Sequence, residues 1–216
     1  MNKYNVVLFD MDGTIANTDE LVAESVQELC AMHGLEAPSK EECYYFSGPP
    51  IRESLAKFPG DVDVEQLFKD FYKISLKKYD QMVVSYPNCR YVLSKLKEKG
   101  IKLGVVTNKA HDAAIHCLEV IGLWDIFSVV IGFEDASKSK PDPEGLLKAT
   151  RLLGEEDLSK VLYVGDSPLD DLAAHNAGIE DVLCIWGPRK LPDNVKPSYK
   201  IYNYLDLLEV VFNEKI

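Results

Sequence analysis

The stretch Asn5-Val6-Val7-Leu8-Phe9-Asp10-Met11-Asp12-Gly13-Thr14 decides the fold of this 216-residue chain. It begins with a near-continuous run of apolar residues, which is typical of a strand buried on both faces of a parallel sheet. Asp10 and Asp12 follow this run, at the end of a strand where open α/β sheets bind their ligands. Since residues two apart in an extended chain point to the same side, both carboxylates are expected to enter one site. Two carboxylates that lie this close are expected either to face a cation or to share one proton between them.

Four further apolar runs later in the chain predict strands of the same kind. These runs cover residues 101–107, 129–132, 161–166 and 181–186. Amphipathic stretches that predict helices lie between them, and a last helix is expected over about residues 205–212. Strands that alternate with helices indicate βαβ units, which build a parallel sheet with helices on both faces. The predicted fold class is therefore α/β, with a Rossmann-like, doubly wound core.

The segment from residue 18 to residue 80 has helical periodicity, and we expect no strand within it. Thr18 is placed to cap the first helix, and Gly34 is placed to end it. Ser39 and Glu42 have the spacing of a capping box for a second helix. The pattern predicts a small α-helical bundle that is inserted directly after the first strand.

This insertion divides the chain into two predicted domains. A catalytic core is expected over residues 1–16 and 84–216, and an α-helical cap over residues 17–83. The two connections, near residues 15–17 and 84–87, are expected to act as hinges between the lobes.

The bulk composition limits the classes of function. The chain carries a formal net charge of −11, has a pI of about 4.9 and contains no Lys/Arg-rich run. Such a surface disfavours nucleic-acid binding, which depends on basic groups that neutralise phosphates. No run of about 18 apolar residues is present, so no membrane span is expected. The first strand begins close to residue 1, which leaves no room for a signal peptide, and a cytoplasmic location is expected.

The cysteines and histidines do not form recognisable metal or disulfide motifs. The five cysteines are scattered and include no C-x-x-C pair. They favour reduced, buried thiols over a disulfide framework or a structural zinc site. The four histidines show no metal-ligand spacing and are expected to be structural or surface groups.

Polar residues follow three of the predicted strands, at the point where each strand ends. The first strand ends in Asp10, the second in Thr107-Asn108, and the fourth in Gly165-Asp166-Ser167. Because the carboxyl ends of parallel strands share one edge of the sheet, these groups are expected to converge on a single crevice. Each ending alone is common at turns and helix starts, but their combination with Asp12 indicates a site.

These residue types suit phosphoryl transfer. Asp10 is the predicted nucleophile, which attacks phosphorus and forms an aspartyl-phosphate. Asp10 and Asp166 are the candidate side-chain ligands of Mg²⁺, which prefers oxygen donors and reduces the repulsion between the nucleophile and an anionic phosphate. Asp12 is predicted to protonate the leaving group and then to deprotonate the attacking water.

A second group of residues is predicted to hold the non-bridging phosphate oxygens. The candidates are the Thr107 hydroxyl, the Asn108 backbone and the Lys140 ammonium. Lys140 precedes a proline at a helix entrance, which favours an extended backbone there. Lys138 is the competing lysine, and we expect it to be a solvated surface group.

Two further acids follow Asp166 in the next predicted helix. Asp170 lies one helical turn further on and is expected to support the metal site rather than to bind the metal directly. Asp171 lies on another face of the helix and is expected to be solvated.

In these motifs the chain resembles the haloacid dehalogenase superfamily, and within it the phosphoglycolate-phosphatase-like branch with an inserted helical cap. The resemblance covers essentially the whole chain, and its motifs occur in the family's order: Asp10-Met-Asp-Gly-Thr, Val106-Thr-Asn, Lys140-Pro-Asp-Pro-Glu and Val164-Gly-Asp-Ser-Pro-Leu-Asp-Asp. It implies that Asp10 is the nucleophile, Asp12 the acid/base, and Thr107 and Lys140 the phosphate clamps. It also implies that Asp10, Asp166 and the backbone carbonyl of Asp12 bind Mg²⁺.

The cap segment from Gly48 to Leu55 resembles the specificity loop of phosphoglycolate phosphatases and of pyrophosphatases in the same branch. Gly48 and Arg52 are therefore candidate substrate-binding residues, with Arg52 either reaching a second anionic group or lying on the surface. The cluster Tyr44-Tyr45-Phe46 is expected to belong to the cap core. The resemblance implies a small phosphorylated metabolite as substrate: phosphoglycolate, pyrophosphate, a sugar phosphate or a nucleotide.

Two alternatives remain at this point. The same branch contains β-phosphoglucomutase-like enzymes, which carry a histidine in the first cap helix, but Val22 occupies that position here and His33 lies a full helix later. A signalling receiver also uses an acidic cluster, a threonine and a lysine at strand ends, but it has no reason for a helical lobe after the first strand. The sequence leaves the oligomeric state open.

Overall fold

The computed structural model describes residues 3–213 of the chain. Within this range, one parallel sheet has the strand order β5-β4-β1-β6-β7-β8. The strands are β1 (Val6–Phe9), β4 (Lys102–Val106), β5 (Val129–Ile131), β6 (Val161–Gly165), β7 (Glu180–Cys184) and β8 (Tyr199–Ile201). The five predicted strands are confirmed. The short edge strand β8 is an addition, because three residues are too few to show a clear strand pattern.

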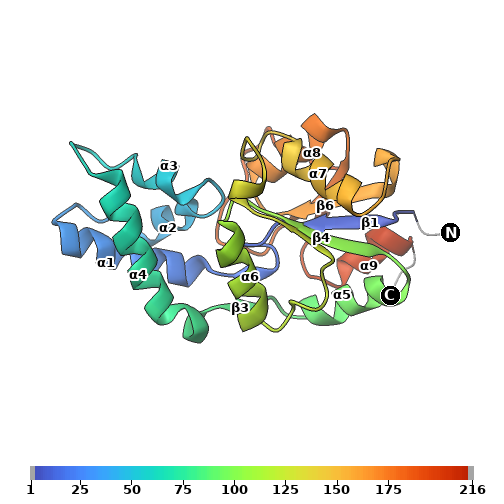
Figure 1. Cartoon of the computed structure of the whole chain (residues 1–216), viewed down its shortest axis with the longest axis horizontal. Coiled ribbons are helices and arrows are strands. Elements are labelled where there is room, and N and C mark those ends of the chain that lie inside the picture. The colour runs from blue at the N-terminus through green and yellow to red at the C-terminus, as the bar shows by residue number, and fades with distance from the viewer. Residues whose placement is uncertain (1–2, 214–216) are drawn as a thin grey trace.

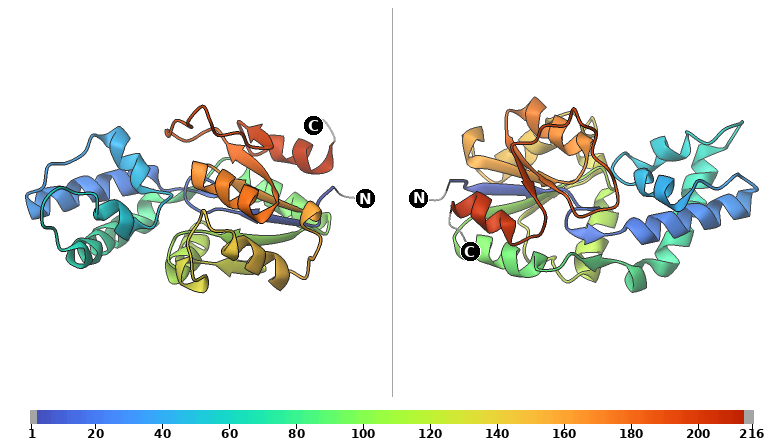
Figure 2. Two further views of the ribbon diagram at one scale, coloured as in Figure 1. Left: turned by 90° about the horizontal axis from the view of Figure 1, so that it is seen from above. Right: turned by 180° about the vertical axis from the view of Figure 1, so that it is seen from behind.

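Helices cover both faces of this sheet (Figures 1 and 2). The helices of the core are α5 (Cys89–Glu98), α6 (His111–Val120), α7 (Glu144–Leu152), α8 (Pro168–Ala177) and α9 (Asp206–Phe212). Val7 and Phe9 of β1 share one hydrophobic cluster with α5, α6 and α9, whereas Val6 and Leu8 share another with α7 and α8. The near-continuous apolar run of β1 therefore reflects burial on both sides, and the predicted doubly wound α/β fold is confirmed.

The register of the sheet brings the strand ends together. β1 lies between β4 and β6, and Phe9 pairs with Val105 on one side and with Val164 on the other. The residues that follow these three strands therefore lie at the same edge, which faces the helical lobe in Figure 1.

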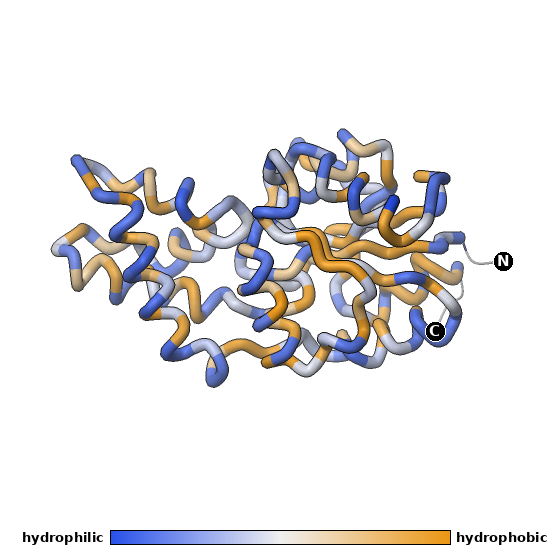
Figure 3. The backbone as a smooth tube through the Cα atoms, in the orientation of Figure 1, coloured by the Kyte–Doolittle hydropathy of each residue, from blue (hydrophilic) through white to orange (hydrophobic). Residues whose placement is uncertain are grey.

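The segment after β1 forms a separate helical lobe beyond the carboxyl ends of the strands (Figure 1). Its helices are α1 (Asp19–His33), α2 (Lys40–Cys43), α3 (Ile51–Leu55) and α4 (Val64–Met82), with one 3₁₀ turn, η1 (Tyr44–Phe46). Leu29, Leu55 and Phe71 belong to a hydrophobic cluster of the lobe's own. Figure 3 shows the strands of the sheet hydrophobic along their length, whereas the tube of α4 alternates between hydrophilic and hydrophobic residues.

A short antiparallel ribbon joins the two lobes. β2 (Ala16–Asn17) pairs with β3 (Val84–Ser85), at the two places where the sequence predicts hinges. The Tyr86 backbone N–H extends the pairing by donating to the Ile15 carbonyl at 3.2 Å. We propose this ribbon as the hinge, with the core over residues 1–16 and 84–216 and the cap over residues 17–83.

The predicted starts and ends of the first two cap helices are found in the structure. Gly34 ends α1 in the left-handed conformation, and Ser39 and Glu42 form the predicted capping box. Thr18 is the N-cap residue of α1, as predicted, but its side chain makes no capping hydrogen bond among the described residues, and its hydroxyl donates to Asp12 instead.

Two expectations from composition also concern the fold. The five cysteines are buried and unpaired, as predicted. Among residues 3–213, no helix is both long enough and apolar enough to cross a membrane.

Candidate active site

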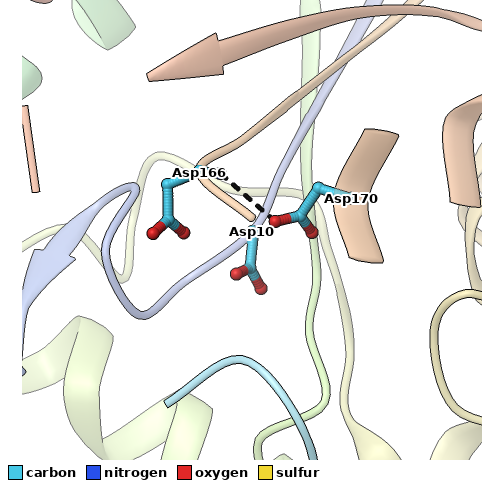
Figure 4. Close-up of side chains that lie close together, drawn as sticks. All are labelled: Asp10, Asp166 and Asp170. Carbon is cyan, nitrogen blue, oxygen red and sulfur yellow. Dashed lines mark hydrogen bonds between the residues drawn. The ribbon is translucent and has the colours of Figure 1, made fainter. Parts of the chain in front are cut away.

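Three carboxylates meet where β1 and β6 end. Oxygen atoms of Asp10, Asp166 and Asp170 lie within 4.8 Å of one another, and all three residues are buried. Figure 4 shows them together, with a hydrogen bond from the Asp166 backbone to Asp170. Asp10 comes directly after β1, Asp166 directly after β6, and Asp170 from the first turn of α8.

Lys140 supplies the opposing charge. Its ammonium lies 2.8 Å from Asp10 Oδ1 and 2.6 Å from Asp170 Oδ1, and it donates to the Tyr163 hydroxyl at 2.9 Å. Burial raises the pKa of Asp10 to about 6, against the lowering effect of Lys140. Burial alone would lower the pKa of Lys140, but Asp10 and Asp170 outweigh it and raise that pKa, so the ammonium stays charged.

Arg189 is a site residue that sequence reasoning missed. Its Nη2 pairs with Asp166 Oδ2, and its Nη1 pairs with Asp19 Oδ1 at 2.7 Å and donates to the Tyr44 carbonyl at 3.0 Å. Burial raises the pKa of Asp166 to about 7, against the lowering effect of Arg189. Arg189 comes from a loop with no recognisable motif, 23 positions after Asp166, and so no local pattern in the sequence marked it.

Gly13 makes room for this ion pair. Its φ is +86°, and a Cβ built there would overlap the Asp166 carboxylate and the Arg189 guanidinium. The glycine in the Asp-x-Asp-Gly motif is therefore required both by its backbone conformation and by the close approach of these groups.

Asp170 is fully engaged by protein donors. Its Oδ1 accepts hydrogen bonds from the Lys140 ammonium and the Tyr163 hydroxyl. Its Oδ2 accepts from the Ser167 hydroxyl and from the backbone N–H groups of Asp166 and Ser167. This geometry suits a supporting role in which Asp170 fixes Lys140 and the start of α8. The expectation that Asp171 is solvated is wrong: it is 6% exposed, because its face of α8 lies inside the protein.

Asp12 lies beside this cluster and is held by donors from both lobes. The Lys109 ammonium donates to both of its carboxylate oxygens at 2.9 Å, and the Thr18 hydroxyl donates to Oδ1 at 2.9 Å. Sequence reasoning did not consider Lys109. A pattern was present, because Lys109 directly follows Thr107-Asn108 at the end of β4.

The other predicted phosphate-binding residues lie at the same edge. Thr107 is buried and lines the cavity between the lobes together with Asn108 and Gly48. The Asn108 side chain accepts from the Lys140 backbone N–H at 2.9 Å and donates to the Gly48 carbonyl at 3.0 Å. The Asn108 side chain thus links two other predicted site residues, Lys140 of the core and Gly48 of the cap.

Arg52 is not brought to this cavity. Its Nε pairs with Glu65 Oε1 at 2.8 Å, and its guanidinium lies 3.5 Å from the centre of the Phe68 ring. Lys138 is 72% exposed in its side chain and pairs with Asp142, as expected of a surface lysine.

Only two members of the aromatic cluster Tyr44-Tyr45-Phe46 belong to the cap core. Tyr44 and Phe46 pack against the cap core, and Phe46 also lines the cavity. Tyr45 is 51% exposed, so the expectation that the whole cluster is core is wrong for this residue; its hydroxyl accepts from the Lys190 backbone instead. Among the histidines, His116 lines the cavity. His33 and His111 lie elsewhere, beside Asp70 and Asp135 respectively.

The acidic cluster fits a hard divalent cation. Three buried carboxylates, Asp10, Asp166 and Asp170, are paired here with two cations, Lys140 and Arg189. Carboxylate oxygens this close suit Mg²⁺, which takes oxygen ligands from one or two carboxylates together with water and a substrate phosphate. Asp10 and Asp166 are the side chains that would hold it.

Comparisons with known proteins agree with this arrangement. The family model described as haloacid dehalogenase-like hydrolase matches residues 7–184. The chain is 31% identical to the pyrophosphatase PpaX of Bacillus cereus, over 97% of each chain, and 31% identical to the phosphoglycolate phosphatase of Aquifex aeolicus, over 96% of this chain and 97% of the relative. A haloacid dehalogenase-like family hydrolase from Streptococcus pneumoniae has a similar fold, with a TM-score of 0.85 and 19% identity over 96% of this chain and 98% of that chain.

Proposed function

Because the chain belongs to the haloacid dehalogenase-like hydrolases, we propose that it is a Mg²⁺-dependent phosphatase that works through an aspartyl-phosphate on Asp10. The observation that carries the proposal is the position of Asp10. Asp10 is 3% exposed, its Oδ1 lies 2.8 Å from the Lys140 ammonium, and the residue lines the cavity between the lobes beside Thr107. A carboxylate nucleophile needs access to the substrate, which the cavity gives Asp10, and a nearby cation that favours its ionised form, which Lys140 supplies.

In the first step, an Asp10 oxygen forms a bond to phosphorus while the bond from phosphorus to the leaving oxygen breaks. Asp12 gives a proton to that oxygen, and Lys109 and Thr18 hold the Asp12 carboxyl in place. The Lys140 ammonium, the Thr107 hydroxyl and the Asn108 backbone N–H bind the non-bridging oxygens, on which charge accumulates in the transition state.

In the second step, Asp12 takes a proton from a water molecule whose oxygen attacks phosphorus. The bond between Asp10 and phosphorus breaks, inorganic phosphate leaves, and the Asp10 carboxylate is regenerated. When bound by Asp10, Asp166 and the Asp12 backbone carbonyl, Mg²⁺ would supply positive charge against the phosphoryl oxygens. Lys140 and Asp170 keep Asp10 in one orientation through both steps.

The relatives suggest the class of substrate. One is named a pyrophosphatase and the other a phosphoglycolate phosphatase, so small phosphorylated metabolites, and phosphate monoesters in particular, are the substrates that we propose. The mutase alternative is less well supported, because Val22 lines the cavity where a titratable residue would be needed. The receiver alternative predicts phosphorylation of Asp10 without continuous turnover.

Phosphate release with and without Mg²⁺ tests the proposal. We expect multiple turnovers of an aryl phosphate in Mg²⁺, and their loss in Asp10→Asn with the fold intact by circular dichroism. Asp125→Asn, at an exposed position outside the site, is the matched control and should retain activity. Ordinary turnover by Asp10→Asn would remove Asp10 from the nucleophile role, and a single turnover by the unmodified protein would favour the receiver.

A further inference from the structure

The cavity that reaches Asp10 has two unlike walls. Its core side presents Asp10, Asp12, Thr107 and Lys109. Its cap side is mainly apolar and aromatic and has no charged side chain among the described residues; it includes Val22, Phe46, Ile51, Phe68, Tyr72 and Leu76, with Ser47 and Ser75 as neutral polar members. In the proposed reaction the core wall binds the phosphoryl group, so the rest of the substrate would contact the cap wall.

The basic side chains that line this cavity already have partners. Lys109 donates to both oxygens of Asp12 and lies 5.6 Å from the centre of the Tyr79 ring. His116 is 3.3 Å from Asp80 and packs against the same tyrosine ring. Among the described residues, no further lysine, arginine or histidine lines this cavity.

Arg52, the arginine of the cap, also has partners outside the cavity. Arg52 follows the lining residue Ile51, but it pairs with Glu65 through two hydrogen bonds and covers the Phe68 ring. A second phosphate or a carboxylate on the substrate would therefore meet an apolar wall and the negative charge of Asp12 and Asp10. Burying a charge without a partner is strongly unfavourable, whereas an apolar group gains free energy by leaving water.

We infer that this enzyme prefers phosphate monoesters whose leaving group is uncharged and apolar, either aromatic or branched aliphatic. The inference rests on the proposed phosphatase function and assigns the cap wall as the determinant of substrate choice. It separates this chain from relatives named for pyrophosphate and phosphoglycolate, both of which carry a second anionic group.

A matched panel of substrates tests the inference. Benzyl phosphate, 3-methylbutyl phosphate, ethyl phosphate and phosphoglycolate all release an alcohol, so differences in kcat/KM report mainly on the leaving group's contacts; pyrophosphate completes the panel. We expect kcat/KM for benzyl phosphate to exceed that for ethyl phosphate and for phosphoglycolate by about 10-fold or more, the usual worth of a filled apolar pocket.

Variants of the cap wall identify the cause of the preference. Leu76 lines the cavity and is 44% exposed, so Leu76→Lys places a cation there without removing a core side chain. We expect it to reduce the ratio of kcat/KM for benzyl phosphate over phosphoglycolate by about 10-fold. Met32, another exposed apolar residue of a cap helix, lies outside the cavity, and Met32→Lys should leave the ratio unchanged.

The outcomes separate the inference from the function on which it rests. Higher kcat/KM for phosphoglycolate or pyrophosphate than for benzyl phosphate would overturn the inference and leave the phosphatase intact. A benzyl preference that Leu76→Lys does not change would overturn the assignment to the cap wall. Absence of turnover with every member of the panel, in a folded protein with Mg²⁺, would overturn the phosphatase function and the inference with it.

Discussion

The Lys109 ammonium contacts both carboxylate oxygens of Asp12, at 2.9 Å each. Together with the Thr18 hydroxyl, which reaches Oδ1 from the start of the cap, it fixes the orientation of the proposed acid/base. Thr18 belongs to the segment that joins the lobes, so movement of the cap would alter one of the contacts of Asp12.

Replacing Lys109 tests whether this orientation matters for catalysis. We expect Lys109→Met to lower kcat by about 100-fold, within the range that a positioned acid/base contributes, with a smaller change in KM. Lys109→Arg should recover part of the loss because it restores a cation beside Asp12. Steady-state kinetics would check this, with the exposed Lys77→Met as control. Unchanged kcat in Lys109→Met would show that Asp12 does not depend on the lysine.

Arg189 should stabilise the metal-free protein more than the metal-bound one. Its guanidinium, Asp19 and Asp166 are all at most 8% exposed in their side chains, so Arg189→Met leaves two buried carboxylates without their partner. Breaking a buried pair of this kind costs about 3 kcal/mol in the free energy of unfolding. Because Mg²⁺ would restore positive charge beside Asp166, we expect a smaller loss in its presence.

Denaturant unfolding with and without Mg²⁺ measures both values. Arg151→Met, at an exposed position of α7, serves as the control and should change neither. An equal loss in both conditions would separate Arg189 from the metal site.

Gly13→Ala separates close packing from backbone strain. Gly13 and Gly60 both have positive φ, at +86° and +92°, but a Cβ at Gly60 meets nothing within 4 Å. Gly60→Ala should therefore show the strain alone, on the order of 1 kcal/mol. We expect Gly13→Ala to destabilise the protein further and to reduce activity, because Asp166 and Arg189 must move. Thermal unfolding and phosphate release would show this, and equal behaviour of the two variants would contradict it.

Binding of Mg²⁺ should weaken as the pH falls. Burial raises the pKa of Asp10 to about 6 and of Asp166 to about 7, both from an ordinary value of 3.8, so the metal-free folded protein binds protons there that the unfolded chain has already lost. The stability of the metal-free protein therefore decreases as the pH rises through this range, and the cation must displace the protons when it binds.

We expect the Kd for Mg²⁺ to be roughly 10-fold weaker at about pH 6 than at about pH 8, with protons released on binding. Isothermal titration calorimetry in two buffers of different ionisation enthalpy measures both. A Kd that does not change with pH would show that neither carboxylate is protonated in the free protein.

The features of this protein that could be predicted are those that depend on residues adjacent in the sequence. β1 is recognisable in the sequence because burial on both faces requires an apolar residue at every position. The positions of Asp10, Thr107 and Asp166 follow because the carboxyl ends of parallel strands share one edge of the sheet. The family resemblance rests on the same local motifs.

What could not be predicted depends on contacts between distant segments. Arg189 reaches Asp166 and Asp19 from a loop whose own sequence carries no recognisable pattern. Asp171 is adjacent to Asp170 and looks like a surface acid, yet the packing of α8 buries it. Arg52 stands in a segment that resembles a specificity loop, but its partners Glu65 and Phe68 come from α4 and hold it off the cavity.

The central claim is that Asp10 carries the phosphoryl group during turnover. Borohydride reduces an acyl-phosphate to an alcohol, so acid-quenching the enzyme during turnover and reducing it should convert phosphorylated Asp10 to homoserine. Peptide mass spectrometry then locates the modified residue, with enzyme quenched without substrate as the control. We predict homoserine at position 10 only when substrate and Mg²⁺ are present. Homoserine at another position, or none at position 10 while phosphate is being released, would contradict the account.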